Sequence, residues 1–85
     1  MQVTGAVLRE QGVTFAVVTV QSQVIQSSHE ARRTIAGLWP AFGVPVVLMA
    51  QDSRGRPTYY GRQDIARFMS RVPVHAIPWR QYTIN

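Results

Sequence analysis

Two valine-rich stretches decide the expected fold: VTFAVVTV at residues 13–20 and VPVVLMA at residues 44–50. β-Branched residues dominate both stretches, which is typical of strands. Apolar residues occupy successive positions, so both faces of each strand are apolar, and such a strand lies inside a sheet or against a partner. One helical segment separates the two stretches, and a single helical crossover between neighbouring strands makes them parallel.

The segment between these stretches has the pattern of an amphipathic helix. Ser27 and Glu30 form a capping box, in which Ser27 accepts a hydrogen bond from the amide three residues on and Glu30 reaches back to the amide of Ser27. The apolar residues that follow share one helical face: Ala31, Ile35, Leu38 and Trp39. Pro40 is expected to end the helix, because the residue before a proline disfavours helical geometry.

An N-terminal hairpin precedes this helix. Residues 3–8 are rich in strand formers, and residues 10–12 form a short turn in which Gly12 can adopt a positive φ. The polar residues 21–26 either extend the second strand or form a loop. The chain therefore begins with two antiparallel strands.

The second half of the chain repeats this order. Residues 51–57 are turn-forming, and residues 58–60 form a short return strand. A second helix begins after Gly61 and ends at Pro73, with apolar residues at helical spacing: Ile65, Phe68, Met69 and Val72. The tail, residues 74–85, holds a candidate fifth strand that a proline interrupts.

These elements predict an α/β domain of the two-layer α+β type that occupies residues 1–85. The element order is β-β-α-β-β-α-β, and the expected sheet is mixed, with four or five strands. Because each helix has one apolar stripe, the simplest arrangement packs the two helices on one face of the sheet. A chain of 85 residues buries only about 60% of its unfolded surface, so a dimer interface would add stability.

The composition limits both class and location. Hydrophobic residues make up 46% of the chain and charged residues 15%, which argues against disorder. The absence of cysteine excludes disulfides, thiolate nucleophiles and cysteine-ligated zinc. The longest apolar run, residues 44–50, is far shorter than the roughly 20 residues of a transmembrane helix, and the N-terminus lacks a signal-peptide pattern. We therefore expect a cytoplasmic protein without membrane contact.

Few residues are suited to catalysis or metal binding. His29 precedes Glu30 at a helix N-terminus, where an imidazole beside a carboxylate could serve as a base, but this pair is more typical of a capping turn. His75 lies in an expected strand, as a half-buried partner of a backbone group. The histidines and carboxylates show no metal-ligand spacing, and no phosphate-binding glycine motif is present. The sequence predicts no catalytic residue, metal or cofactor, which argues against an enzyme.

An arginine–aromatic cluster in residues 54–82 is the strongest functional signal. All nine basic residues are arginine, six of them lie in residues 52–85, and the formal net charge is +5. Arginine contacts phosphates, and tyrosine rings stack on unpaired bases. The candidate contacts for nucleic acid or another anionic partner are Arg54, Arg56, Tyr59, Tyr60, Arg62 and Arg80. A structural role competes with this hypothesis, because alternation along a strand sends one of Tyr59 and Tyr60 into the core.

Surplus apolar strand surface predicts self-association. Residues 13–20 and 44–50 are apolar on both faces, but two helices on one face leave the other face bare. A bare apolar sheet face usually marks an interface, and a second copy placed back to back or edge to edge would cover it. The first hypothesis is therefore a non-enzymatic binding or protein-interaction module that forms a homo-oligomer, most simply a homodimer. Nucleic-acid binding is the alternative.

Two short segments resemble parts of a known family. Val44-Pro45-Val46-Val47 resembles a strand that opens with a cis-proline, and Gly61 with Asp64 resembles the start of a final helix, as in thioredoxin-like and glutaredoxin-like domains. A cysteine-less thioredoxin-like domain is thus a minor alternative. The family's redox chemistry requires cysteines, and its proline strand runs antiparallel to its first strand, where a parallel pair is expected here. The resemblance implies a fold and transfers no function.

Overall fold

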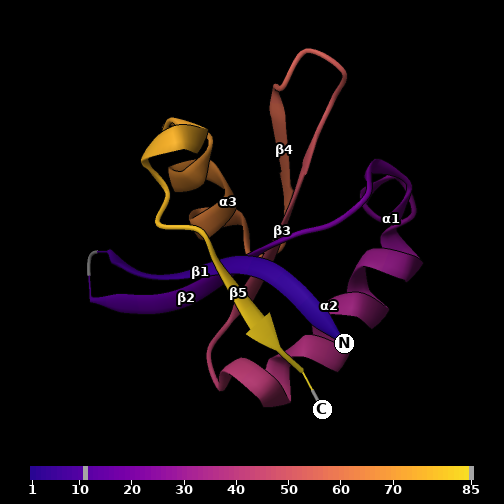
Figure 1. The fold of residues 1–85 in the computed structure, drawn as a ribbon, viewed down its shortest axis with the longest axis vertical. Helices are drawn as coiled ribbons and strands as arrows, with labels where there is room; N and C mark the ends of the chain where they lie inside the picture. Colours follow the sequence, from indigo (N-terminus) through magenta and orange to yellow (C-terminus); the bar gives the residue numbers. More distant parts are fainter. Residues whose placement is uncertain (11, 85) are drawn as a thin grey trace.

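The computed structural model describes residues 1–10 and 12–84, which form a five-stranded sheet with helices on both faces (Figure 1). The strands are β1 (Gln2–Glu10), β2 (Val13–Thr19), β3 (Val46–Gln51), β4 (Pro57–Tyr60) and β5 (Arg80–Thr83). The helices are α1 (Ser22–Gln26), α2 (Ser28–Phe42) and α3 (Gln63–Met69), followed by a 3-10 turn, η1 (Val74–Ala76). The predicted order of the long elements is confirmed. Residues 21–26, which were predicted to be a strand extension or a loop, contain the short helix α1, and α3 ends at Met69, before the predicted end at Pro73.

The sheet has the strand order β4-β3-β2-β1-β5. The two valine-rich strands, β2 and β3, are parallel neighbours, with Val18 opposite Leu48, and the remaining pairs are antiparallel. The predicted mixed sheet and its parallel central pair are therefore confirmed. Because β2 and β3 have a strand on either side, their backbone groups are hydrogen-bonded in the interior of the sheet.

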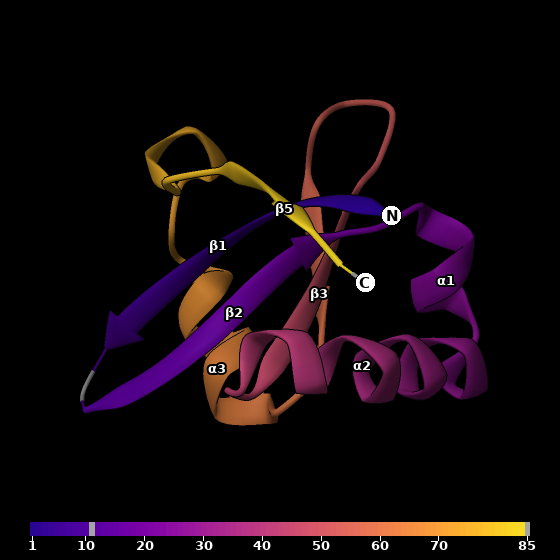
Figure 2. The same cartoon turned by 60° about the horizontal axis from the view of Figure 1, so that its bottom comes forward.

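Alternate residues of the central strands face two different helical layers. Val17 and Val47 pack with α3, whereas Val18 and Leu48 pack with α2. Figure 2 shows α2 across the near side of the sheet and α3 behind β2. The prediction that both helices pack on one face of a two-layer domain is wrong. Strands that are apolar on both faces need cover on both, and helices on opposite sides provide it within one chain.

The helix α2 differs from its expected form at its C-terminal end. It begins at the predicted cap, since the amide of Glu30 donates to Ser27 Oγ over 3.3 Å, but the reciprocal bond of the capping box, from the amide of Ser27 to the Glu30 side chain, does not form in the described residues. It continues through Pro40 to Phe42 and ends at Gly43, which has a φ of 68° and donates its amide to Trp39 O over 2.8 Å. Pro40 has no backbone N–H, so the last turn of the helix lacks one hydrogen-bond donor. The helix continues past this position and ends at the next residue that can adopt a left-handed conformation, Gly43.

The C-terminal segment forms an edge of the sheet. β5 pairs with the start of β1, and beyond it the amide of Ile84 donates to Met1 O over 2.7 Å, so the two termini lie together. His75 lies exposed in η1, not half-buried in a strand as predicted. In the N-terminal hairpin, Gly12 has the expected positive φ of 79°, and the predicted turn residue Gln11 lies outside the described residues.

Pro45 departs from the feature on which the family resemblance depended. No cis peptide bond occurs in residues 1–10 and 12–84, so Pro45 precedes β3 through a trans bond. The carbonyl of Pro45 accepts the amide of Ala16 over 2.8 Å, which begins the parallel pairing of β2 and β3. The cis-proline implied by the thioredoxin-like resemblance is therefore not present.

Candidate functional site

The structure divides the predicted arginine–aromatic residues between the two edges of the sheet. Arg54 and Arg56 lie in the β3–β4 hairpin, Tyr59 and Tyr60 lie in β4, and Arg62 follows β4. Arg80 is the first residue of β5, at the opposite edge. Three strands lie between these edges, so Arg80 cannot share a small ligand with the others.

The two tyrosines of β4 face opposite sides of the sheet. Tyr59 pairs with Met49 and packs against the α3 layer, whereas Tyr60 pairs with Leu48 and packs on the α2 layer. The hydroxyl of Tyr59 is buried without a hydrogen-bond partner, and burial raises the pKa of this hydroxyl. Both tyrosines are half-buried, and only Tyr60 lies on the same face of the sheet as α2.

The hairpin that carries Arg54 and Arg56 is organised by Asp52. One carboxylate oxygen accepts the amides of Arg54 and Arg56 over 2.8 and 2.9 Å, and the other accepts Nε of Arg56 over 3.0 Å. The amide of Arg56, followed by the amide of Arg54 and the Arg56 guanidinium, holds the pKa of Asp52 below its ordinary value. The hairpin therefore presents exposed arginines from an ordered turn.

A groove between α2 and β4 gathers arginine and aromatic side chains at one place. It has a volume of about 300 Å³. Its lining residues come from α2, from the start of β3 and from the end of β4: Arg32, Ile35, Trp39, Pro45, Val46, Tyr60, Gly61 and Arg62. No carboxylate lines this groove in the described part of the chain. Arg62 is ion-paired with Asp64 just outside the lining, so the positive charge of the groove comes mainly from Arg32.

The close approach of Gly61 to β3 shapes one end of this groove. Gly61 has a φ of 153°, and a Cβ at this position would lie 3.0 Å from Val47 Cγ2 and 3.1 Å from Val47 Cα. A glycine therefore lets the chain leave β4 tightly against β3. Arg62 follows at once, and its Nε donates to Asp64 Oδ1 over 2.9 Å, which orients the guanidinium.

The contact with Arg62 affects the pKa of the Asp64 carboxylate. Partial desolvation alone would raise its pKa. The hydrogen bond from Arg62 and one from the amide of Ile65 outweigh that effect, and the net pKa lies below the ordinary value. Asp64 is therefore ionised and stays bonded to Arg62 across the neutral pH range.

Sequence reasoning missed two residues of the groove, Arg32 and Trp39. The predicted apolar stripe of this helix includes Trp39, and Arg32 lies outside the stripe. Trp39 is 53% exposed, because α2 buries Ala31 and Leu38 and turns the flank with Arg32, Ile35 and Trp39 toward β4. The spacing i, i+3, i+7 places these three residues on one side of a helix, but nothing local shows which strand they meet.

The aromatic residues near β5 have a packing role. The rings of Tyr82 and Phe42 meet edge to face, with centroids 5.1 Å apart. The indole N–H of Trp79 donates to Val74 O over 3.0 Å. The ring contact ties β5 to the C-terminal end of α2, and the indole hydrogen bond fixes the turn that precedes β5.

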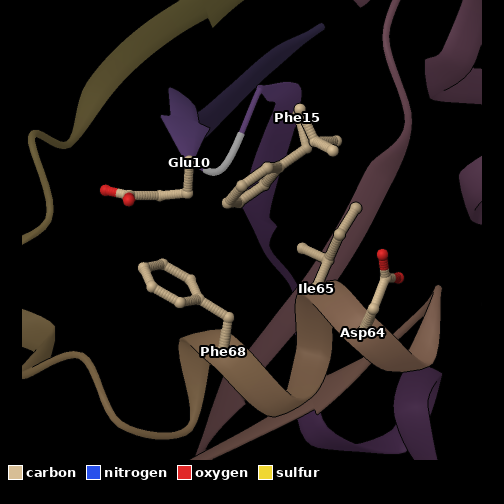
Figure 3. Close-up of a pocket in the computed structure, with 6 residues that line it drawn as sticks. Glu10, Phe15, Asp64, Ile65 and Phe68 are labelled. Carbon is tan, nitrogen blue, oxygen red and sulfur yellow. The ribbon is translucent and has the colours of Figure 1, made fainter.

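A second cavity lies on the opposite face, between the N-terminal hairpin and α3 (Figure 3). Phe15, Ile65 and Phe68 point toward a shared hollow of about 80 Å³, and the carboxylates of Glu10 and Asp64 lie on either side of it. Asp64 is bonded to Arg62, and the hollow is too small for an organic substrate. Its small size and largely apolar lining are typical of a gap between packed aromatic rings and not of a reaction site.

Metal ligands are not assembled in residues 1–10 and 12–84. No group of three or more histidine, cysteine, aspartate or glutamate side chains is close enough to hold an ion. His29 and His75 are exposed and lie on different elements, α2 and η1.

Comparison with known proteins adds no relative. No protein-family model matches the chain, and no curated protein and no solved structure matches it. Within residues 1–10 and 12–84, no helix has the length and apolar character needed to cross a bilayer.

Proposed function

We propose that this chain is a non-enzymatic binding protein that holds single-stranded nucleic acid along the β4 edge of its sheet. The groove between α2 and β4 carries this proposal, because it combines Arg32 and Arg62 with the rings of Trp39 and Tyr60 and has no carboxylate in its lining. Guanidinium groups bind phosphates, and indole and phenol rings stack on bases.

Further positive charge extends from this groove along the edge. Arg54 and Arg56 lie at the far end of β4, in the exposed hairpin. At about 3.3 Å per residue, Arg56 lies roughly 13 Å from Tyr60, which is a path for more than one phosphate. The formal net charge of +5 favours association with a polyanion at low salt.

The aromatic rings of the groove favour binding of a single strand over a duplex. In a duplex the faces of the bases are covered by their neighbours, so the rings of Trp39 and Tyr60 have nothing to stack on. An unpaired base can enter a groove of about 300 Å³ while its phosphates stay outside, near the arginines.

Self-association, the first hypothesis from the sequence, has lost the feature that motivated it. The helices α2 and α3 cover opposite faces of the sheet, so β2 and β3 have no bare apolar face that needs a second copy. The edge strand β4 is short and begins with Pro57, two features that protect an edge against pairing. A binding role at the groove therefore stands ahead of a homodimer.

The test is fluorescence anisotropy of a dye-labelled oligothymidylate titrated with the protein at about 50 mM salt and above. We expect tighter binding of the single strand than of a duplex of the same length, and affinity that falls steeply with salt. Arg32→Gln should weaken binding and lower the salt slope by about 1. Arg33→Gln is the matched control, because Arg33 is the exposed neighbour on α2 and does not line the groove.

Two outcomes contradict the proposal. One is the absence of binding at about 50 mM salt, where phosphate contacts are strongest. The other is equally tight binding of polyglutamate, which would assign the groove to acidic protein segments. An equal loss in Arg32→Gln and Arg33→Gln would move the binding site away from the groove.

A further inference from the structure

We infer that the groove takes one unpaired nucleotide, with its base against Trp39 and its flanking phosphates on Arg32 and Arg62. This inference rests on the proposed function and deepens it. It states that the ligand is held through a base as well as through charge, and it assigns these two contributions to different residues.

Packing within the fold does not explain why Trp39 is exposed. The residue is 53% exposed, although large aromatic residues usually bury most of their surface. The other tryptophan, Trp79, is half-buried in the α3 layer and donates its indole N–H to Val74 O. An exposed ring at the rim of a positive groove is the arrangement that stacking on a base requires.

The interior of the groove is apolar. Ile35, Pro45 and Val46 line it together with the ring of Tyr60, and Val46 is only 4% exposed. Apolar and aromatic walls suit the flat face of a base, which stacks without needing hydrogen bonds.

The two arginines of the groove come from different elements. Arg32 comes from α2 and Arg62 from the segment after β4. The bond from Arg62 to Asp64 uses Nε, so the N–H donors on its two Nη atoms remain for a phosphate. A nucleotide placed in the groove therefore meets apolar walls at its base and guanidinium donors at its backbone.

The size of the groove limits the ligand. Sites for small organic ligands range from about 300 to 1,000 Å³, and this groove lies at the lower end at about 300 Å³. It therefore suits one base with its sugar and not two stacked bases. The rest of a bound strand would follow the exposed β4 edge toward Arg54 and Arg56.

Tryptophan fluorescence tests the position of the base. The chain has two tryptophans, so Trp79→Phe leaves Trp39 as the sole indole emitter. We expect the Trp39 emission to fall as a short oligothymidylate binds, with the midpoint that anisotropy gives. In Trp39→Phe the remaining Trp79 emission should stay constant during the same titration.

An abasic oligonucleotide of the same length and charge separates this inference from the proposed function. We expect oligothymidylate to bind about 5- to 150-fold more tightly than the abasic strand, and Trp39→Ala to remove this difference but keep the salt dependence. Circular dichroism checks that Trp39→Ala folds, which its exposed position favours.

Each failure has its own meaning. If the abasic strand binds equally well and the Trp39 emission does not change, the base subsite is wrong and the nucleic-acid function stands. If neither strand binds at about 50 mM salt, both proposals are wrong. If quenching is confined to Trp79, the base lies near β5 and the assignment to this groove is wrong.

Discussion

Arg32 in α2 and Arg62 after β4 line the same groove, although β3 and β4 lie between them in the sequence. Asp64 Oδ1 lies 2.9 Å from Arg62 Nε, so Arg62 reaches the groove as one half of an ion pair, whereas Arg32 has no ion pair within the described residues. The two proposed phosphate contacts therefore come from elements that only the fold brings together.

A double-mutant cycle tests whether these arginines share one ligand. Arg32→Gln and Arg62→Gln should each weaken oligothymidylate binding roughly threefold to tenfold, as expected for charged contacts that are partly exposed. The double variant should lose less than the product of the two single losses, because each single change already disrupts the shared nucleotide. Losses that multiply exactly in anisotropy titrations would show that the two arginines bind independent phosphates.

Gly61→Ala is expected to destabilise the protein by about 1–3 kcal/mol. The added Cβ would meet Val47 and the carbonyl of Val46 at 3.0 to 3.2 Å, and the φ of 153° is unfavourable for alanine. Gly37→Ala is the control, because a Cβ at Gly37 meets nothing within 4 Å inside α2. That change should add about 0.5–1 kcal/mol of helix stability. Urea unfolding measures both, and an equal effect of the two changes would rule out the close approach.

Val17→Thr and Val18→Thr test whether both faces of the sheet are core. Both residues are 0% exposed, and they pack on α3 and on α2 respectively. Each change buries a hydroxyl in an apolar layer, so each should lower the free energy of unfolding by about 1–3 kcal/mol. If one of the two were tolerated without loss in urea unfolding, that face would be open to solvent or to a partner.

Tyr59→Phe is expected to keep or raise the free energy of unfolding, by up to about 1 kcal/mol, because it removes a buried hydroxyl without a partner. Burial raises the folded pKa of Tyr59 above its ordinary 10.0, so the unfolded state ionises first as the pH rises. The native protein therefore loses stability above pH 10.0, and the variant should lose less. Identical alkaline unfolding curves for both proteins would contradict this. Tyr60→Phe, on the other face, is the control for the loss of a hydroxyl.

Asp52→Asn tests the hairpin that carries Arg54 and Arg56. The folded pKa of Asp52 lies below its ordinary 3.8, so the native state binds fewer protons than the unfolded state in acid. The stability that this carboxylate provides is fully present above pH 3.8 and is lost as the pH falls through the folded value. The gap in thermal midpoint between the native protein and Asp52→Asn should therefore narrow between neutral pH and about pH 2. A gap that stays constant would show that the charge of Asp52 has no part in the turn.

Local patterns predicted most of the secondary structure because the interactions behind them are local. The cap at Ser27, the apolar spacing of Ile65 and Met69, and the parallel pairing of β2 with β3 all follow from near neighbours or from one short crossover. The predicted end of α2 at Pro40 is wrong, because a proline near the end of a helix does not by itself end it. The helix ends at Gly43, which has a left-handed conformation.

The candidate site was predicted only in part, because some of its residues are far apart in the sequence. Tyr60 and Arg62 were found because they lie in one short segment, but Arg32 and Trp39 join them only through the packing of α2 beside β4. Arg80 was grouped with them by sequence and lies at the other edge of the sheet.

The sequence by itself determined the long elements, their order and the central pair of apolar strands, but not the short helix α1 or the turn η1. Only the tertiary structure decided that α3 covers the face opposite α2, and that a groove with two arginines forms beside Trp39. An apolar stripe shows that a helix must be buried, but the side of the sheet it reaches depends on the path of the connection from β4, which no local pattern records.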